Sequence, residues 1–238
     1  MQSAITPSGM LHTAILVAFV IALNLVSLEI VSAEDKPDKP DKPIQVDKEK
    51  KTVTIACKIA PRKLPNLSEI YPIEVIATLS TPKGQKAHET IVTFEAIPSD
   101  IHKAMESLGL KAGKPAKGEG AVAAGPEVKI FLELPGAGGL NKRLPIEKAL
   151  VDRKTGKTMP PLKWIFTGSS TKRPDPNKTD VVYGADTSGT LIAIFPVTDE
   201  TVFQTHLTLK DEPLIKLDTN SKVLPEIGTA VQLVIQVP

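Results

Sequence analysis

Apolar residues alternate with polar ones along much of the chain, and this pattern constrains the fold more than any other feature. The clearest run carries its apolar side chains at Val53, Ile55, Cys57 and Ile59. Successive side chains of a β-strand point to opposite faces of a sheet, so such a run buries one face and exposes the other. Further β-rich runs lie at 73–79, 88–94, 128–134, 144–151, 162–167, 181–183, 191–195 and 231–237.

These runs predict a mainly β (α+β) fold, with a single sandwich- or barrel-like domain that begins at Ile44. Strands do not alternate regularly with helices, which argues against a doubly wound parallel sheet. One clear helix is expected near 99–108, because Ser99 is a good N-cap and Gly109 is a good C-terminal stop. Its apolar face is formed by Ile101, Ala104, Met105 and Leu108. The Gly-, Ala-, Lys- and Pro-rich segment 111–126 is expected to be a mobile loop.

The N-terminus predicts export. Residues 14–23 are an unbroken apolar run, and Val31-Ser32-Ala33 supplies the small residues that a signal peptidase accepts. We expect 1–33 to be a signal peptide cleaved after Ala33, which leaves the protein in the periplasm or outside the cell. The alternative is that the segment stays as a membrane anchor, although its apolar run is shorter than the roughly 20 residues of a bilayer span.

A repeated tripeptide follows the predicted cleavage site. Three copies of Asp-Lys-Pro occupy residues 35–43. Proline at every third position removes backbone donors and fixes φ, so neither a helix nor a sheet can form there. We expect residues 34–43 to be an extended, solvated tether.

Charge and composition exclude several classes of protein. The net charge is +2 and basic residues are interspersed with acidic ones, which argues against a nucleic-acid partner. The single cysteine, Cys57, excludes a disulfide scaffold and an all-cysteine iron–sulfur site within one chain. Because Cys57 lies on the apolar face of its predicted strand, it is expected to be a buried core residue.

Three histidines are candidate metal ligands. His88 and His102 are separated by a short connection that could bring their rings together, with Glu89 or His206 as a further ligand. Neutral imidazole suits a transition metal such as zinc or copper. On a regular strand, however, His88 and Glu89 would point to opposite faces, and no HExxH-like spacing is present. The alternative is that His88 fixes a loop through hydrogen bonds.

Trp164 and Ser169 are further candidate ligand-binding residues, because both lie near the end of a predicted strand. The alternative is that Trp164 anchors the core while Gly168 and Ser169 open a turn. No set of nucleophile, base and orienting group can be assembled from the sequence, so no catalytic residue is predicted.

Several stretches are similar to those of a known family. They are 86–90, 98–104, 108–115, Trp164-Ile165-Phe166-Thr167-Gly168-Ser169 and Tyr183-Gly184-Ala185-Asp186 with Gly189 following. Together they resemble the YdjY-domain family of bacterial exported or envelope proteins. The resemblance implies a YdjY-like β-rich domain over 44–238 and an exported location, and it implies no reaction. A ferredoxin-type label carried by some relatives does not fit a chain with one cysteine.

Three functions are therefore open. The first is an exported cell-envelope protein that acts as a non-catalytic binding or scaffold module, with an envelope protein or a small ligand as partner and no cofactor. The second is a metal-binding or redox-assisting envelope protein that uses His88 and His102. The third is a hydrolase that uses Ser169 or Glu89, for which no motif is present.

Overall fold

The computed structural model describes residues 42–175, 177 and 179–238. Contacts divide the chain into two units, residues 1–34 and 35–238, and the described residues lie in the second. The predicted signal peptide at 1–33 and most of the predicted tether at 34–43 lie outside the described residues. None of the helices in the described part of the chain has the length and hydropathy that a membrane span needs.

Short strands make up most of the regular structure, and they are joined by few helical segments. The strands are β1 (Ile44–Asp47), β2 (Thr52–Ile59), β3 (Val75–Leu79), β4 (Val92–Phe94), β5 (Glu127–Leu134), β6 (Lys142–Pro145), β7 (Leu150–Asp152), β8 (Trp164–Phe166), β9 (Thr171–Lys172), β10 (Val182–Tyr183), β11 (Thr190–Ala193), β12 (Phe203–Thr205), β13 (Leu217–Thr219) and β14 (Ala230–Gln236). The α-helices are α1 (Pro98–Ser107) and α2 (Gly184–Ser188), with 3₁₀ turns η1 (Ala137–Gly139) and η2 (Ile146–Ala149).

Eight of the described strands close into a barrel in the order β2-β14-β5-β8-β12-β11-β3-β4, with β4 pairing back onto β2. The β3–β4 and β11–β12 pairs are parallel, and the other pairs of the barrel are antiparallel. The prediction of a mainly β domain with one clear helix is thereby confirmed, and of the two predicted shapes the structure has the barrel-like one.

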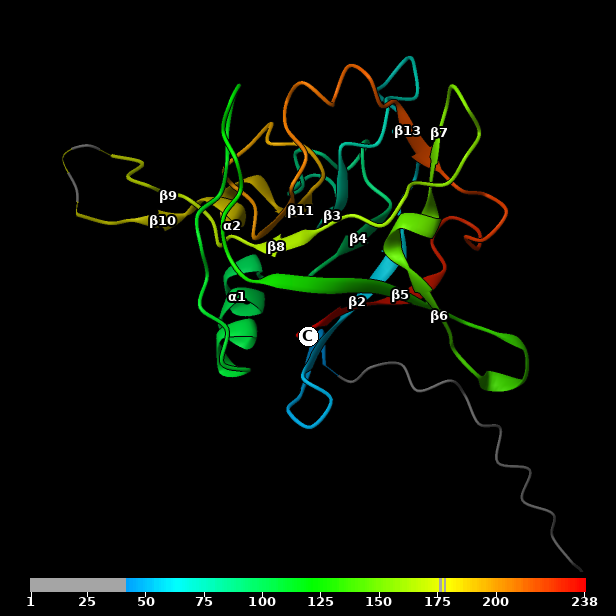
Figure 1. The fold of residues 1–238 in the computed structure, drawn as a ribbon, viewed down its shortest axis with the longest axis horizontal. Helices are drawn as coiled ribbons and strands as arrows, with labels where there is room; N and C mark the ends of the chain where they lie inside the picture. Colours follow the sequence, from blue (N-terminus) through cyan, green and yellow to red (C-terminus); the bar gives the residue numbers. More distant parts are fainter. Residues whose placement is uncertain (1–41, 176, 178) are drawn as a thin grey trace, which may run out of the picture. The chain divides into compact units, whose positions relative to one another are not determined.

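The long strands β2 and β5 each change partner along their length. β2 pairs with β1 over Thr52–Ile55 and with β4 over Cys57–Ile59. β5 likewise pairs with β8 near Glu127 and with β6 over Phe131–Leu134. An antiparallel sheet in the order β1-β2-β14-β5-β6 therefore extends beyond the closed barrel (Figure 1).

The barrel interior is filled by the apolar positions of the alternating strands. In β2 these are the four predicted residues Val53, Ile55, Cys57 and Ile59, all of which are buried. Helix α1 adds Ile101 and Met105 to the same core. Cys57 is confirmed as a buried residue, and its burial raises the pKa of the thiol to about 12. A thiol with so high a pKa is a poor nucleophile at neutral pH.

Two predicted strands are shorter or more broken than their sequences suggested. The run 88–94 is a strand only from Val92, because Gln85–Glu89 form a turn. The run 144–151 is divided into β6, η2 and β7, because Pro145 ends β6 and directs the chain into the 3₁₀ turn. Strands β1, β9, β12 and β13 and helix α2 were not predicted from the sequence.

Helix α1 begins one residue earlier than predicted, and its N-terminus is capped from another element. Ile97 is the N-cap and Ser99 lies inside the first turn. The Ser99 N–H donates instead to Oδ1 of Asp186 in α2, at 2.8 Å. The carboxylate oxygen accepts a hydrogen bond from a helix N–H that has no partner within the helix. Its negative charge also interacts favourably with the positive end of the helix dipole. The first turn of α1 is thus hydrogen-bonded to α2.

The segment 111–126 is a loop, as its composition predicted, and backbone hydrogen bonds connect it to the rest of the domain. The Gly113 N–H donates to the carbonyl oxygen of Phe166, and the Gly118 N–H donates to that of Pro196. Lys114 and Ala124 form an isolated bridge that folds the segment back on itself. These bonds hold the segment against the outer face of the short strands.

Candidate functional site

His102 lies on α1 in a half-buried cluster with Tyr183 and Glu106. Its Nδ1 is 2.6 Å from the Tyr183 hydroxyl, and its Nε2 is 3.3 Å from Oε1 of Glu106, one helical turn away. The ring also packs edge-on against Phe166, with 5.0 Å between the ring centroids. The imidazole is therefore held by partners on three sides.

The direction of the hydrogen bonds follows from their donors. The Ser169 N–H donates to the Tyr183 oxygen over 3.1 Å. Burial raises the pKa of the Tyr183 phenol well above its usual range, so the hydroxyl keeps its proton at neutral pH. In the His102 tautomer that carries its proton on Nε2, this nitrogen donates to the Glu106 carboxylate and Nδ1 accepts the Tyr183 proton. The cluster is therefore a chain of hydrogen bonds that runs from the Ser169 N–H through Tyr183 and His102 to the Glu106 carboxylate.

Ser169 is engaged at the start of α2. Its Oγ accepts the Ala185 N–H at 2.9 Å and donates to the Ser170 carbonyl oxygen at 3.1 Å. This hydroxyl therefore acts as a cap for a helix that lacks a side-chain cap of its own. In the described residues no base is hydrogen-bonded to this oxygen, which a serine nucleophile requires.

Gly168 explains why the turn before Ser169 can lie so close to the histidine. Its φ of +65° is in the left-handed region, and a Cβ there would lie 2.9 Å from Cβ of Ala112 and 3.1 Å from Cε1 of His102. Only glycine fits both the backbone conformation and the space. The resemblance quoted for 164–169 thus falls on residues that hold this cluster together.

His88 and Glu89 belong to a different cluster, which contains further charged groups. Nε2 of His88 is 3.1 Å from Oε1 of Glu89, so the prediction that the two side chains point to opposite faces is wrong. The reason is that both residues lie in a turn rather than on a strand. Lys86 Nζ contacts Oε2 of Glu89 at 2.6 Å and Oε2 of Glu74 at 2.8 Å. Burial opposes the charge of Lys86, but the two carboxylates outweigh it and raise the Lys86 pKa.

Backbone contacts fix the His88 turn as well. Arg62, on a neighbouring loop, donates from Nη1 to the His88 carbonyl oxygen at 3.0 Å and from Nη2 to the Tyr71 carbonyl oxygen at 2.6 Å. Its Nε donates to Oδ1 of Asp218 at 3.1 Å. The Tyr71 ring packs edge-on against the His88 ring, with the centroids 5.2 Å apart. These contacts hold the backbone of the His88 turn beside the loop that carries Tyr71.

The structure gives the candidate metal ligands separate surroundings. No contact joins His88 to His102 among the described residues, and Nδ1 of His206 accepts the Lys163 N–H at 3.2 Å. Within 42–175, 177 and 179–238, no group of three or more His, Cys, Asp or Glu side chains could hold a metal ion. The metal-binding hypothesis stays a prediction, which elemental analysis of the purified protein tests directly.

Trp164 lies in the core rather than on a binding surface. It is 2% exposed, and its Nε1–H donates to Oε1 of Glu147 at 2.8 Å. The same carboxylate oxygen accepts the Leu162 N–H at 3.2 Å. Neither face of the indole is open to a ligand.

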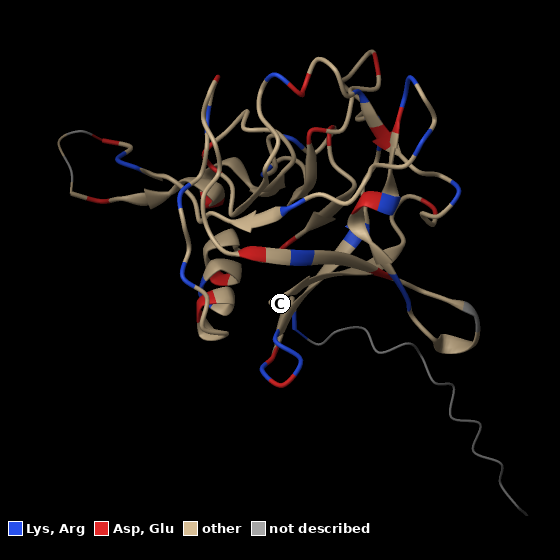
Figure 2. Ribbon diagram, in the orientation of Figure 1, with Lys and Arg blue, Asp and Glu red and all other residues tan. Residues whose placement is uncertain are grey.

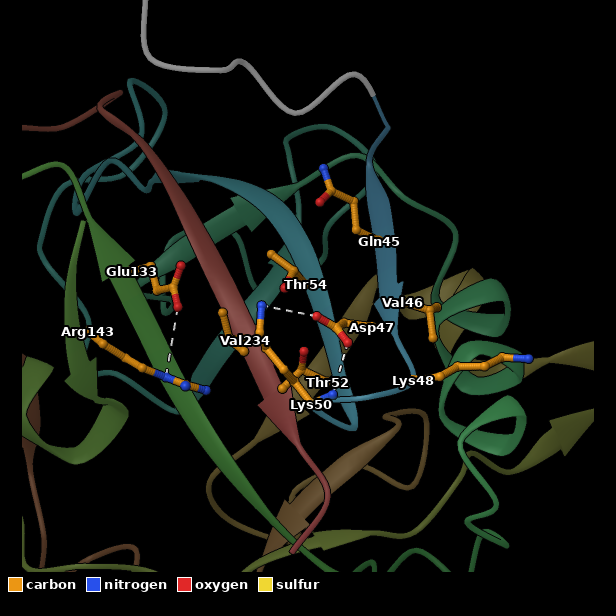
Figure 3. Close-up of a pocket in the computed structure, with 10 residues that line it drawn as sticks. All are labelled: Gln45, Val46, Asp47, Lys48, Lys50, Thr52, Thr54, Glu133, Arg143 and Val234. Atoms are coloured by element: carbon orange, nitrogen blue, oxygen red, sulfur yellow. Dashed lines mark hydrogen bonds and ion pairs between the residues drawn. The ribbon is translucent and has the colours of Figure 1, made fainter. Parts of the chain in front are cut away.

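A hollow on the outer face of the extended sheet was not predicted, and we call it the outer hollow (Figure 3). It has a volume of about 640 Å³. Its lining comes from β1, the β1–β2 turn, β2, β5, β6 and β14, and consists of Gln45, Val46, Asp47, Lys48, Lys50, Thr52, Thr54, Glu133, Arg143 and Val234. Strand register places Gln45, Thr54 and Val234 side by side in one row across the sheet.

The outer hollow is polar and carries charges of both signs. Lys50 pairs with Asp47 at 3.2 Å, and Arg143 lies 3.9 Å from Glu133 (Figure 3). A hydrogen bond from the Lys50 N–H is the main cause that lowers the Asp47 pKa. Lys48 has no ion-pair partner among the described residues. Basic and acidic residues also alternate along the β1–β2 turn in Figure 2.

A signal for the outer hollow was present in the sequence. The polar members of the alternating runs, such as Thr54 and Gln232, mark the solvent-facing side of the sheet. Two elements completed the hollow without such a signal. Strand β1 is only four residues long, and β6 lies inside a run that was read as one strand.

A second cavity, of about 400 Å³, lies beside the end of β7 and the loop that leads from β7 to β8. Pro160, Pro161 and Leu207 line it, and His206 lies at the same place. Because Nδ1 of His206 accepts the Lys163 N–H, the His206 ring is held in place in the lining of this cavity.

Comparison with known families gives one clear result. Residues 44–236 match the YdjY domain, which is most of the chain and nearly the whole of the described part. The comparisons with curated proteins and with solved structures gave no match. The match begins at the first residue of β1 and ends at the last residue of β14. The chain therefore belongs to the YdjY domain family.

Proposed function

We propose that the chain is an exported cell-envelope protein and that its β-rich domain is a non-catalytic binding module. The observation that carries the proposal is the outer hollow, a concave surface of about 640 Å³ in a sheet face. Concave sites with a few convergent polar groups are the usual places where proteins hold a ligand.

The chemistry of the hollow supports a polar, hydrated ligand. Its floor presents the hydroxyls of Thr52 and Thr54, and one wall presents the amide of Gln45. Opposite charges are already paired at Asp47 and Glu133, so a ligand meets little net charge apart from Lys48. A polar peptide or a glycan of the envelope has the donors and acceptors that such a surface binds.

The surroundings of the candidate site residues support a role other than catalysis. The hydroxyl of Ser169 caps α2, and the ring of His102 links α1 to Tyr183. Glu89 is held by Lys86 and His88. Each group already has the partners that a structural residue needs, and none lines the outer hollow.

Export is supported by the sequence of residues 1–33 and is tested by fractionation. A cell that produces the full chain is separated into cytoplasmic, periplasmic, membrane and culture fractions. We expect the protein outside the cytoplasm, with Glu34 as its first residue by mass spectrometry. Full-length protein in the cytoplasm would overturn the proposal.

Binding at the outer hollow is tested with a panel of fluorescein-labelled probes. The panel contains acidic, neutral and basic octapeptides and two soluble glycans, and fluorescence anisotropy reports binding. We expect at least one class to bind, and we expect Thr54→Tyr, which fills the hollow without changing its charge, to weaken that binding at least tenfold. Ser221→Tyr, at an exposed position outside the hollow, is the matched control. No binding by any class, or equal loss in both variants, contradicts the proposal.

A further inference from the structure

We propose that β1 is an open sheet edge that accepts an extended acidic segment of a partner protein as an added strand. Addition of a strand to a sheet edge is a common way in which proteins bind peptides, because the main-chain hydrogen bonds provide affinity and alternate side chains provide specificity. This inference rests on the proposed function, since it names the kind of partner that lies at the rim of the outer hollow.

The backbone of β1 presents free hydrogen-bonding groups. The Ala56 N–H donates to the Pro43 carbonyl oxygen at 3.1 Å, which makes this a hydrogen-bonded pair of the antiparallel ladder. Hydrogen-bonded and non-bonded pairs alternate in such a ladder. With the observed register, Gln45 and Asp47 therefore bond to β2, while the N–H and C=O groups of Ile44 and Val46 point away from it. No described residue bonds to those outward groups.

The other edge of the same sheet is protected, and the contrast supports the choice of β1. Strand β6 carries Lys142, Arg143 and Pro145 within four residues. Lysine and proline on an edge strand are features that prevent strand addition. The four residues of β1 contain neither. One edge of this sheet is thus closed and the other is open.

The side chains around β1 define the chemistry of the added strand. Val46 is 40% exposed and lies on the face of the buried Val53, so an apolar residue of a new strand would cover it. On the other face, the new strand would lie next to Gln45 and Asp47, at the rim of the hollow. Figure 3 shows Lys48 on the Val46 side of β1, where it has no ion-pair partner among the described residues, and this favours an acidic residue of the new strand beside it. The partner segment therefore carries an apolar residue beside Val46 and an acidic residue beside Lys48.

Charge argues against a second copy of this chain as the added strand. If two β1 strands paired about a twofold axis at Gln45, Ile44 of one copy would lie opposite Val46 of the other. The same register would place Lys42 opposite Lys48. Like charges directly opposite in a sheet are destabilising. An acidic segment from another protein avoids this repulsion.

The test uses fluorescein-labelled octapeptides and a variant that changes one backbone group. The probe carries Val and Glu in turn at every second position, with Thr between them, and its controls replace Glu with Lys or carry a central proline. Val46→Pro removes an outward N–H but keeps the bonds from β1 to β2, so the fold is expected to remain, with an unchanged circular dichroism spectrum. Val46→Thr keeps the N–H. We expect the acidic probe to bind, Val46→Pro to weaken it at least tenfold, and Val46→Thr to stay within twofold.

Hydrogen exchange gives an independent readout of the same bond. The acidic probe is expected to slow exchange of the Val46 amide by at least tenfold, without a comparable effect on the β6 amides. Failure of the acidic probe to bind, or binding that Val46→Pro leaves unchanged, would refute strand addition at β1. Dimerisation of the free chain that Val46→Pro abolishes would also refute it, because the added strand would then be a second copy.

The experiment separates this inference from the proposed function. If Thr54→Tyr abolishes binding of a panel probe while Val46→Pro does not, the outer hollow binds a ligand and the added-strand inference is wrong. If Val46→Pro abolishes binding of the acidic probe while Thr54→Tyr does not, β1 binds as inferred and the hollow is not the binding site.

Discussion

The two sides of the barrel bury their residues in different ways. On one side, the long strands β2, β14 and β5 bury one face and leave the other to solvent, as the alternation along β5 shows. On the other side, the short strands β3, β4, β8, β11 and β12 are buried on both faces. Their outer faces lie beneath loops and helices of the same chain.

The difference has a consequence for polar residues. On the short-strand side, outward-facing polar side chains have lost water and must bond to protein. The hydroxyl of Thr78 donates to the Gly189 carbonyl oxygen at 2.9 Å, and the side-chain amide of Gln204 donates to the Ala116 carbonyl oxygen at 2.9 Å. On the long-strand side, Thr54 keeps its contact with water. The short-strand side therefore provides stability, and the long-strand side presents the proposed binding surface.

The largest expected effect comes from emptying the core of the short-strand side. Phe166 is fully buried against Phe203 and His102. Phe166→Ala is expected to lower the free energy of unfolding by about 3–5 kcal/mol, because it leaves a cavity. Phe131→Ala, on the outer face of β5 beneath Arg143, is expected to cost about 1 kcal/mol. Urea unfolding measures both, and equal losses would contradict the comparison.

The next effect tests whether outward polar residues differ between the sides. Gln204 on β12 donates to the carbonyl oxygens of Ala116 and Thr198 and accepts the Ala116 N–H. Gln204→Ala leaves these buried groups unpaired and is expected to cost about 1–3 kcal/mol. Gln232→Ala, on the solvent-facing side of β14, is expected to stay within about 0.5 kcal/mol of the parent. Thermal and urea unfolding measure both losses of stability. A larger loss for Gln232→Ala than for Gln204→Ala would contradict the proposed difference between the two sides.

A smaller loss is expected at the cluster that joins the helices. Tyr183→Phe removes the hydroxyl that accepts the Ser169 N–H and donates to His102, and it is expected to cost about 1 kcal/mol. Tyr71→Phe is the matched control, because the hydroxyl of Tyr71 forms no hydrogen bond with another described residue while its ring contact is kept. If both variants unfold at the same urea concentration, the cluster adds nothing to stability.

The smallest expected effect is a pH dependence on the short-strand side. Burial raises the pKa of Asp199, but Lys117, at 3.1 Å in the covering loop, outweighs it and holds the pKa below its usual value. A carboxylate with a lowered folded-state pKa stabilises the fold above its unfolded pKa of about 3.9, and this stabilisation is lost as the pH falls through the folded value.

Asp199→Asn is therefore expected to be less stable than the parent at pH 7, by at most about 1 kcal/mol. When the pH falls below about 4, the free energy of unfolding of Asp199→Asn is expected to decrease less than that of the parent. Unfolding curves from pH 2 to pH 7 measure the two slopes. Parallel curves for the parent and Asp199→Asn would show that the Lys117 pair does not hold the loop. Ser221→Ala gives the baseline for an exposed position.

The same comparison explains how much of the fold could be predicted. The long strands were found because one solvated face makes the alternation visible, as in 53–59 and 128–134. Strand β12 has only three residues, Phe203–Thr205, and it is buried on both faces. Such a segment shows no alternation, so the sequence pattern could not reveal it. Closure of the barrel depends on these short strands and on their pairing with strands distant in sequence.

Prediction of the candidate sites met a different obstacle. Residue types identified His88, Glu89, His102 and Ser169 as reactive groups, but their partners are distant in sequence or depend on a turn. Tyr183 lies 81 residues from His102 in the chain, and no local spacing reports such a contact. The outer hollow carries only common polar residues, and its shape arises from the register of several strands. No local sequence motif corresponds to a shape that is formed in this way.

The change of partner along β2 and β5 has a practical consequence for engineering. Because the barrel closes through β4 and β8, the ends of β2 and β5 that pair with β1 and β6 are outside the closed ring. The hairpin between β5 and β6 ends at Gly138 and Gly139, where a Cβ would meet no other atom within 4 Å. An epitope or a fluorescent reporter inserted between these glycines would leave every pairing of the ring in place, and it would lie beside the proposed binding surface.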